Sequence, residues 1–302
     1  MTFHTIIVGV DGRQGGRDAL ALAQRLRPVA GELVAVQAYA CESYASGPAD
    51  ARYESERHAE VQATLADEIG RAGITAGAQA VLDGGPAHAL HRAAEEERAA
   101  LIVVGSSHRG PVGRVVAGDV ASSTLHGSPC PVLVAPVRYA EDAGPLATIG
   151  VGFDGSPGSR AAVVLARDVA VALGARLKVL TVIEAPGAWT AYPAWAHDSH
   201  GDASAVRDAT QASLDALVTA LGTPAAGEIL EGRPARELAR AAEELDLLVC
   251  GSRPGGSLAR MLLGSRSGRL VHEAPCPVMV LPEGMAEHVV QDDPRWLAAH
   301  AS

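Results

Sequence analysis

Aromatic and lysine side chains are both scarce in this chain of 302 residues. Two phenylalanines, three tryptophans and five tyrosines make up 3% of the sequence, so the interior must be built from Val, Leu, Ile and Ala. Lys178 is the single lysine, and 25 basic residues face 35 acidic ones, which gives a net charge of −10. Because binding to nucleic acid phosphates requires a basic surface, we expect no nucleic acid partner.

Long apolar runs and close cysteine pairs are also missing, and we expect no leader segment. No apolar stretch reaches the length that a bilayer requires, and the N-terminus enters strand-like sequence within a few residues. We therefore expect a cytoplasmic protein that does not interact with a membrane. The cysteines form no C-x-x-C motif, and we interpret them as small buried apolar residues in a reducing compartment: Cys41, Cys130, Cys250 and Cys276.

What the sequence does contain is an internal duplication. The phrase Val8–Gly12 (VGVDG) returns as Val151–Gly155 (VGFDG), 143 positions later. The phrase Pro129–Val134 (PCPVLV) returns as Pro275–Val280 (PCPVMV), 146 positions later. A period of this length is that of a whole domain and is too long for a solenoid repeat.

A polar segment with Gly and Pro, residues 138–146, separates the two copies and is interpreted as a linker. We therefore place a first domain at residues 1–137 and a second domain at residues 147–283. A C-terminal tail would follow at residues 284–302.

Each half alternates short apolar runs with amphipathic stretches. Strands that are apolar throughout are typical of parallel sheets covered on both faces. With right-handed crossovers, this pattern predicts an α/β fold of two tandem Rossmann-like domains, each a doubly wound, five-stranded parallel sheet. In the first half, the expected strands are Thr5–Val10, Glu32–Ala38, Thr75–Leu82, Ala100–Val104 and Val132–Ala135, and the expected helices are Gly16–Val29, Ala51–Arg71, Ala87–Arg98 and Asp119–His126. In the second half, the expected strands are Thr148–Phe153, Arg176–Val182, Ala225–Leu230, Leu245–Cys250 and Val278–Leu281.

The repeated phrases fall where such a sheet binds ligands, beyond the carboxyl ends of its strands. Asp11 and Asp154 end the first strand of each half, and Gly105 and Gly251 end the fourth. The helix that follows the fourth strand presents free backbone N–H groups and the positive end of its dipole, which favour a phosphate.

Taken together and in duplicate, these motifs resemble the universal stress protein family over both halves. The resemblance is carried by V-G-x-D-G, by Gly84–Pro86 and Gly232–Pro234, by the Gly-Ser loops and by the P-C-P-V strands. It implies that the halves pack about a pseudo-two-fold axis with their fifth strands paired. We expect two such chains to form a homodimer.

The resemblance also implies a site for an adenine nucleotide, ATP with or without Mg²⁺. The first aspartate and a backbone group of the second strand would contact the adenosine; these are Asp11 with Ala38, and Asp154 with Val182. A glycine loop, G-x-x-G-x(9)-G-[S/T], would hold the phosphates.

In the second half, Gly251 opens this loop, Arg253 lies within it, and Gly264 and Ser265 close it. Pro254 replaces the second glycine of the motif. Proline has no N–H to donate and its φ is fixed, so one phosphate contact is lost. The second half is therefore predicted to hold a weakened ATP site.

In the first half, the loop opens at Gly105, has His108 at the second glycine position and closes with Gly118-Asp119. A carboxylate at the start of a helix caps the dipole itself and competes with phosphate. The charge of His108 would compensate in part for the negative charge of Asp119. This half is predicted to be the poorer ATP site.

Structural roles compete with these interpretations. Asp11 and Asp154 each precede a glycine and are also suited to capping a turn, and Ser265 is suited to capping a helix. We find no convincing catalytic pair of residues and expect no metal site. Three functions stay open: a regulatory protein that binds ATP without substantial turnover, a stress scaffold that binds no nucleotide, and a slow ATPase.

Overall fold

The computed structural model describes residues 3–40, 48–82, 84–106, 114–115, 119–184, 203–251 and 274–282. The first half contains β1 (Phe3–Gly9), α1 (Gln14–Arg25), η1 (Arg27–Val29), β2 (Ala30–Tyr39), α2 (Pro48–Ala72), β3 (Gly77–Leu82), α3 (Pro86–Glu96), β4 (Leu101–Gly105), α4 (Asp119–Leu125) and β5 (Val132–Ala135), and η2 (Tyr139–Glu141) follows. The second half contains β6 (Thr148–Gly152), α5 (Pro157–Leu173), β7 (Arg176–Ile183), α6 (Ala203–Ala220), β8 (Ala225–Glu231), α7 (Pro234–Ala241), η4 (Ala242–Glu244), β9 (Leu247–Gly251) and β10 (Val278–Leu281).

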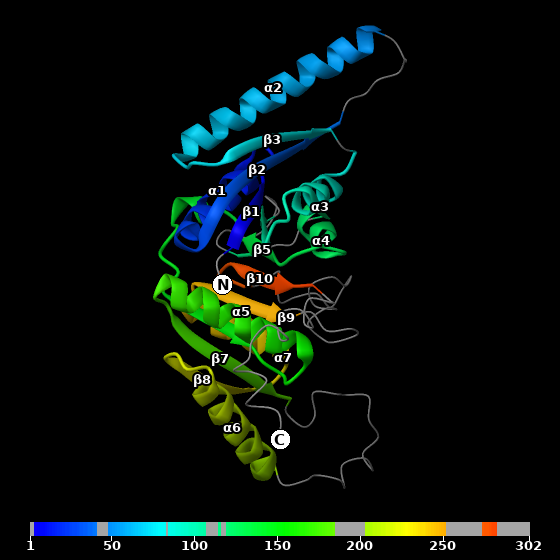
Figure 1. Cartoon of the computed structure of the whole chain (residues 1–302). Coiled ribbons are helices and arrows are strands. Elements are labelled where there is room, and N and C mark those ends of the chain that lie inside the picture. The colour runs from blue at the N-terminus through cyan, green and yellow to red at the C-terminus, as the bar shows by residue number, and fades with distance from the viewer. Residues whose placement is uncertain are drawn as a thin grey trace, which may run out of the picture.

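The ten strands within the described residues form one sheet, in the order β3-β2-β1-β4-β5-β10-β9-β6-β7-β8. Neighbouring strands are parallel except at the centre, where β5 and β10 pair antiparallel with Leu133 opposite Met279. The strand order of the first half therefore returns in mirror image, as a two-fold axis at this junction requires (Figure 1). The predicted α/β fold, its five strands per half and the pairing of the fifth strands are confirmed.

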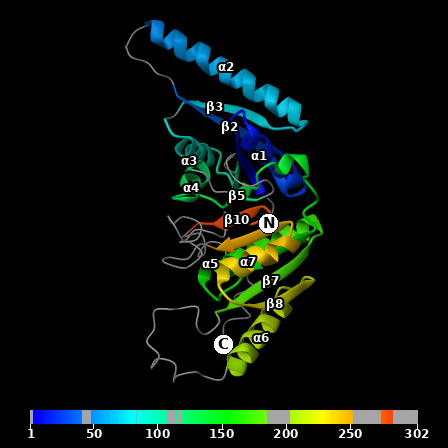
Figure 2. The same ribbon diagram turned by 180° about the vertical axis from the view of Figure 1, so that it is seen from behind.

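The sheet is covered on both faces. One hydrophobic core beneath α1, α2, α5 and α6 runs without interruption across the junction, from Leu20 through Leu133 and Met279 to Val163. On the other face, α3 and α4 cover the first half and α7 covers the second. In Figures 1 and 2, α2 and α6 lie at opposite ends of the molecule, with β5 and β10 between them. Burial on both faces explains why the strands are apolar throughout.

Helix α5 shows how local sequence sets its ends. The Ser156 side chain accepts a hydrogen bond from the N–H of Ser159, and Pro157 occupies the first turn, where an N–H has no helical partner. Gly174 ends the helix in the left-handed conformation, with φ of 66°.

Helix α1 is shorter than predicted. The helix expected over Gly16–Val29 ends at Arg25, and a separate 3₁₀ turn covers Arg27–Val29. Pro28 is the physical reason, because it has no N–H to donate and its ring clashes with the preceding helical turn. The ends of the other predicted elements differ from the observed ones by three residues or fewer.

The predicted linker packs against the first half through the turn η2. The buried carboxylate of Asp18 accepts hydrogen bonds from the backbone N–H groups of Arg138 (2.8 Å) and Ala140 (3.0 Å). Burial raises the pKa of Asp18 above its ordinary value, although these hydrogen bonds oppose the rise. The duplication places Ala161 at the equivalent position of the second half, so this attachment belongs to the first half alone.

Three of the four cysteines are buried free thiols, as the sequence predicts: Cys130, Cys250 and Cys276. Burial raises the pKa of Cys130 and Cys250 to about 12, so neither is a reactive thiolate at neutral pH. Cys41 lies outside the described residues. Within the part of the chain that the structure describes, no helix is long and apolar enough to cross a bilayer.

Candidate functional site

A cavity of about 350 Å³ lies at the carboxyl ends of the first-half strands. It brings together three of the predicted site residues: Asp11 after β1, Ala38 near the end of β2, and Gly105 at the end of β4. Asp119, the first residue of α4, also lines it. The size is within the range of small-molecule sites, and the position is where a doubly wound sheet binds its ligand.

Asp11 caps the start of α1. Its Oδ1 atom accepts hydrogen bonds from the N–H groups of Arg13 (3.0 Å) and Gly16 (3.1 Å). Its other oxygen, Oδ2, accepts no hydrogen bond from the residues that the structure describes. The capping role expected from the Asp-Gly turn is therefore present, and it uses only half of the carboxylate.

Gly105 is required by helix packing. A Cβ atom at this position would collide with the carbonyl oxygen of Gly15 in the first turn of α1. The second half repeats the contact, because a Cβ at Gly251 would collide with the carbonyl of Gly158 in α5. These glycines let the start of a helix approach the end of a strand, which brings helical N–H groups close to the cavity.

The charges around the first-half cavity are mostly negative. Asp11 and Asp119 contribute two carboxylates and Arg13 one guanidinium. Asp119 stands at the start of α4, where a carboxylate satisfies the helix dipole. The arrangement disfavours a phosphate that arrives without a cation.

The carboxyl ends of the second-half strands are arranged in the same way, with one difference at the start of α5. Asp154 Oδ1 accepts a hydrogen bond from the N–H of Ser156 (3.0 Å). The N–H of Ser159, equivalent to that of Gly16, bonds to Ser156 Oγ (3.2 Å) instead of to the aspartate. Capping of α5 therefore falls mainly to Ser156. Val182, the counterpart of Ala38, lies near the end of β7, which pairs with β6 as β2 pairs with β1.

Five predicted phosphate-contacting residues lie outside the described part of the chain: His108, Gly118, Arg253, Gly264 and Ser265. The structure therefore describes the strand-end part of each predicted site and not its phosphate loop.

Other residues that line the cavity were missed by sequence reasoning. Gly15 has a detectable signal, because it recurs as Gly158 at the same distance from the first aspartate. Pro86, the first residue of α3, has a signal in the duplicated motif Gly84–Pro86, whereas Leu90 of the same helix has none. Ser106 also borders the cavity, but its hydroxyl donates to the carbonyl of Ala135 (2.6 Å).

The comparisons with known proteins concern the family and the fold. A model of the universal stress protein family matches residues 2–136 and again residues 146–282. A universal stress protein of Mycobacterium tuberculosis is 34% identical over 194 residues, which span 60% of this chain and 61% of that relative's length. One from Mycolicibacterium smegmatis is 29% identical over 294 residues, or 93% of this chain and 97% of the relative.

Among solved structures, a universal stress protein from Archaeoglobus fulgidus superimposes with a TM-score of 0.61. It is 22% identical, and the match covers 92% of this chain and 96% of that one, so the likeness shows the fold. The family model accounts for nearly the whole chain, in two copies. This protein belongs to the universal stress protein family.

Proposed function

We propose that this protein is a stress-response regulator that binds an adenine nucleotide, ATP, without substantial turnover. The observation that carries the proposal is the cavity at the carboxyl ends of the strands, which Asp11, Ala38 and Gly105 line together. The family resemblance expects Asp11 and Ala38 to contact the adenosine, and Gly105 to open the loop that holds the phosphates. The ligand would change conformation or partner choice, and no reaction step is required.

We propose the second domain as the better ATP site. In the first domain, Asp119 places a carboxylate at the helix start that would face the phosphates. The second domain has Ser265 at this position, and a hydroxyl can cap a helix and still donate to a phosphate.

Titration calorimetry with ATP and MgCl₂ on a matched pair of variants tests both parts of the proposal. Val182→Phe and Ala38→Phe place the same bulky ring at equivalent strand ends, one in each domain. We expect Val182→Phe to weaken ATP binding at least about tenfold, the effect of losing roughly 1.4 kcal/mol of binding free energy. Ala38→Phe should change the dissociation constant of the tightest ATP site by no more than about twofold. The reverse ranking would contradict the assignment to the second domain.

A scaffold that binds no nucleotide is the second candidate, and two observations favour it. Asp11 caps α1, and Gly105 accommodates α1, so both have a role in the fold without a ligand. If neither Phe variant changes the calorimetric signal because the protein itself binds no ATP, the scaffold is the correct function. Steady phosphate release that disappears in Asp154→Ala would instead indicate the slow ATPase.

A further inference from the structure

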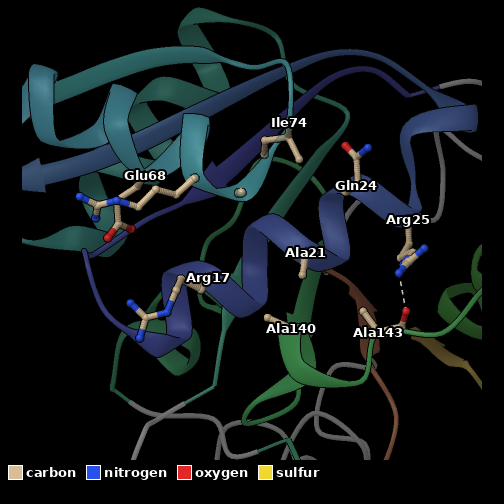
Figure 3. Close-up of a pocket in the computed structure, with 10 residues that line it drawn as sticks. Arg17, Ala21, Gln24, Arg25, Glu68, Ile74, Ala140 and Ala143 are labelled. Carbon is tan, nitrogen blue, oxygen red and sulfur yellow. Dashed lines mark hydrogen bonds between the residues drawn. The ribbon is translucent and has the colours of Figure 1, made fainter.

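A second cavity, of about 370 Å³, lies on the outer side of α1. Its floor is the exposed stripe of α1 that includes Arg17, Ala21 and Arg25. The C-terminal end of α2 forms one wall, and the segment that follows β5 forms the other (Figure 3). It shares no lining residue with the cavity at the strand ends.

Glu68 is the unusual residue of this cavity. The side chain comes from α2 and is only 9% exposed, and its Oε2 atom is buried. No residue that the structure describes donates a hydrogen bond to that atom. A buried carboxylate oxygen without a donor is costly, so its presence requires an explanation.

The second half of the chain shows that the fold does not require this carboxylate. Gly73 follows α2 and Gly222 follows α6, and both have a positive φ, 65° and 62°. We use these two glycines to align the two helices. Five residues before each glycine stand Glu68 and Leu217. Leu217 is buried in the hydrophobic core. The same structural position is therefore filled by an apolar side chain in one half and by an unpaired acid in the other.

Arginines supply the opposite charge along the same cavity: Arg71 of α2, which forms an ion pair with Asp67, and two arginines of α1. In Figure 3, Arg17 lies toward the same end as Glu68, and Arg25 lies at the other end, with Ala21 between them. Eight residues of helix separate the two arginines, a rise of about 12 Å. Arg17 donates to Gln14 (3.1 Å) and Arg25 to the carbonyl of Ala143, which leaves further guanidinium N–H groups for an anion.

We propose that this cavity is a binding site for a small organic zwitterion, with its ammonium group on Glu68 and its carboxylate on Arg25. The middle of the cavity, lined by Ala21, Ala140 and Ile74, would take an aliphatic chain. An ammonium group supplies the donor that Glu68 Oε2 lacks, and a guanidinium pairs well with a carboxylate. Such a ligand would bridge α1, α2 and the linker.

Binding of 6-aminohexanoate to the full-length protein, measured by calorimetry, tests the proposal. Hexanoate and hexylamine are the matched probes, because each keeps the chain and lacks one of the two charges. We expect 6-aminohexanoate to bind at least about tenfold more tightly than either, as the loss of one charged hydrogen bond implies. Equal affinity for the three compounds, or no binding of 6-aminohexanoate, would overturn the proposal.

Glu68→Leu introduces the residue that the second half carries at the same position. We expect it to reduce 6-aminohexanoate affinity at least about tenfold and to raise the unfolding temperature, because the unpaired buried oxygen is removed. Glu68→Gln keeps the shape and should also lose affinity. Undiminished binding in Glu68→Leu, or a lower unfolding temperature, would overturn the proposal by assigning the carboxylate to the fold. ATP affinity serves as a separate readout and should not change.

Discussion

At the scale of the residue, Asp18 ties the linker to the first domain. It is buried on α1, and both of its oxygens accept hydrogen bonds from backbone N–H groups, those of Arg138 and Ala140. Arg138 adopts a left-handed conformation with φ of 62°, which the surrounding hydrogen bonds must hold in place. One carboxylate thus anchors the turn that begins the connection between the domains.

Asp18→Ala should lower the free energy of unfolding by about 2 kcal/mol, because two backbone donors lose their acceptor. Urea denaturation at neutral pH would measure the change. Asp142→Ala, an exposed carboxylate of the same segment, is the control and should stay within about 0.5 kcal/mol of the unmodified protein. Equal effects of the two substitutions would contradict the role given to Asp18.

The same residue predicts a dependence of stability on pH. Burial raises the pKa of Asp18 above 3.8, so the unfolded chain ionises first as the pH rises, while the folded protein keeps its proton. In this window the folded state binds more protons, and stability falls with rising pH. The unfolding free energy of the protein minus that of Asp18→Asn should therefore decrease as the pH rises from about 3.8. An increase in this difference over the same pH range would show that the hydrogen bonds to Asp18 affect its pKa more than burial does.

At the scale of the element, each first helix begins against the end of a fourth strand. Gly15 meets Gly105 in the first domain, and Gly158 meets Gly251 in the second. The close contact brings the N-terminus of the helix to the carboxyl edge of the sheet, where the strand-end cavity of the first domain lies. The duplicated glycines therefore serve the fold directly and the cavity indirectly.

Gly105→Ala and Gly251→Ala should each destabilise the protein by about 1–3 kcal/mol, the usual cost of overpacking a closely packed contact. Thermal unfolding of both variants would measure this cost. Gly144→Ala is a matched control, because its added Cβ would meet nothing within 4 Å. If the two glycine variants were as stable as the control, the close contact would not be a requirement of the fold.

Strands were easier to predict than helix ends and site roles. Buried strands such as β9 are apolar along their whole length, so the sequence pattern alone identifies them. The end of α1 depends on how Pro28 is accommodated within one turn, which periodicity does not reveal. The cap formed by Asp11 was predictable from the Asp-Gly turn because its contacts are local. The unpaired oxygen of Glu68 depends on how α2 packs against other segments, and the local sequence does not reveal it.

At the scale of the whole molecule, the two domains share one sheet and one core. Leu133 of β5 and Met279 of β10 face each other across the junction, and both belong to the hydrophobic core that extends into both halves. The two domains should therefore unfold together. The homodimer stays a prediction.

Met279→Asp should test this coupling, because it buries a charge at the junction of the two domains. Amide hydrogen exchange followed by mass spectrometry should show faster exchange in β4 of the first domain as well as in β9 of the second. The conservative variant Met279→Leu should leave exchange in both strands nearly unchanged. Loss of protection confined to the second domain would show that the halves are independent.

We propose that this member of the universal stress protein family binds an adenine nucleotide. The most direct measurement is to denature the purified protein and identify the released small molecules by mass spectrometry, together with a thermal shift on adding ATP and magnesium. We expect a released adenine nucleotide or a rise in unfolding temperature with ATP, and a smaller response in Val182→Phe than in Ala38→Phe. No released nucleotide together with no thermal shift would contradict it.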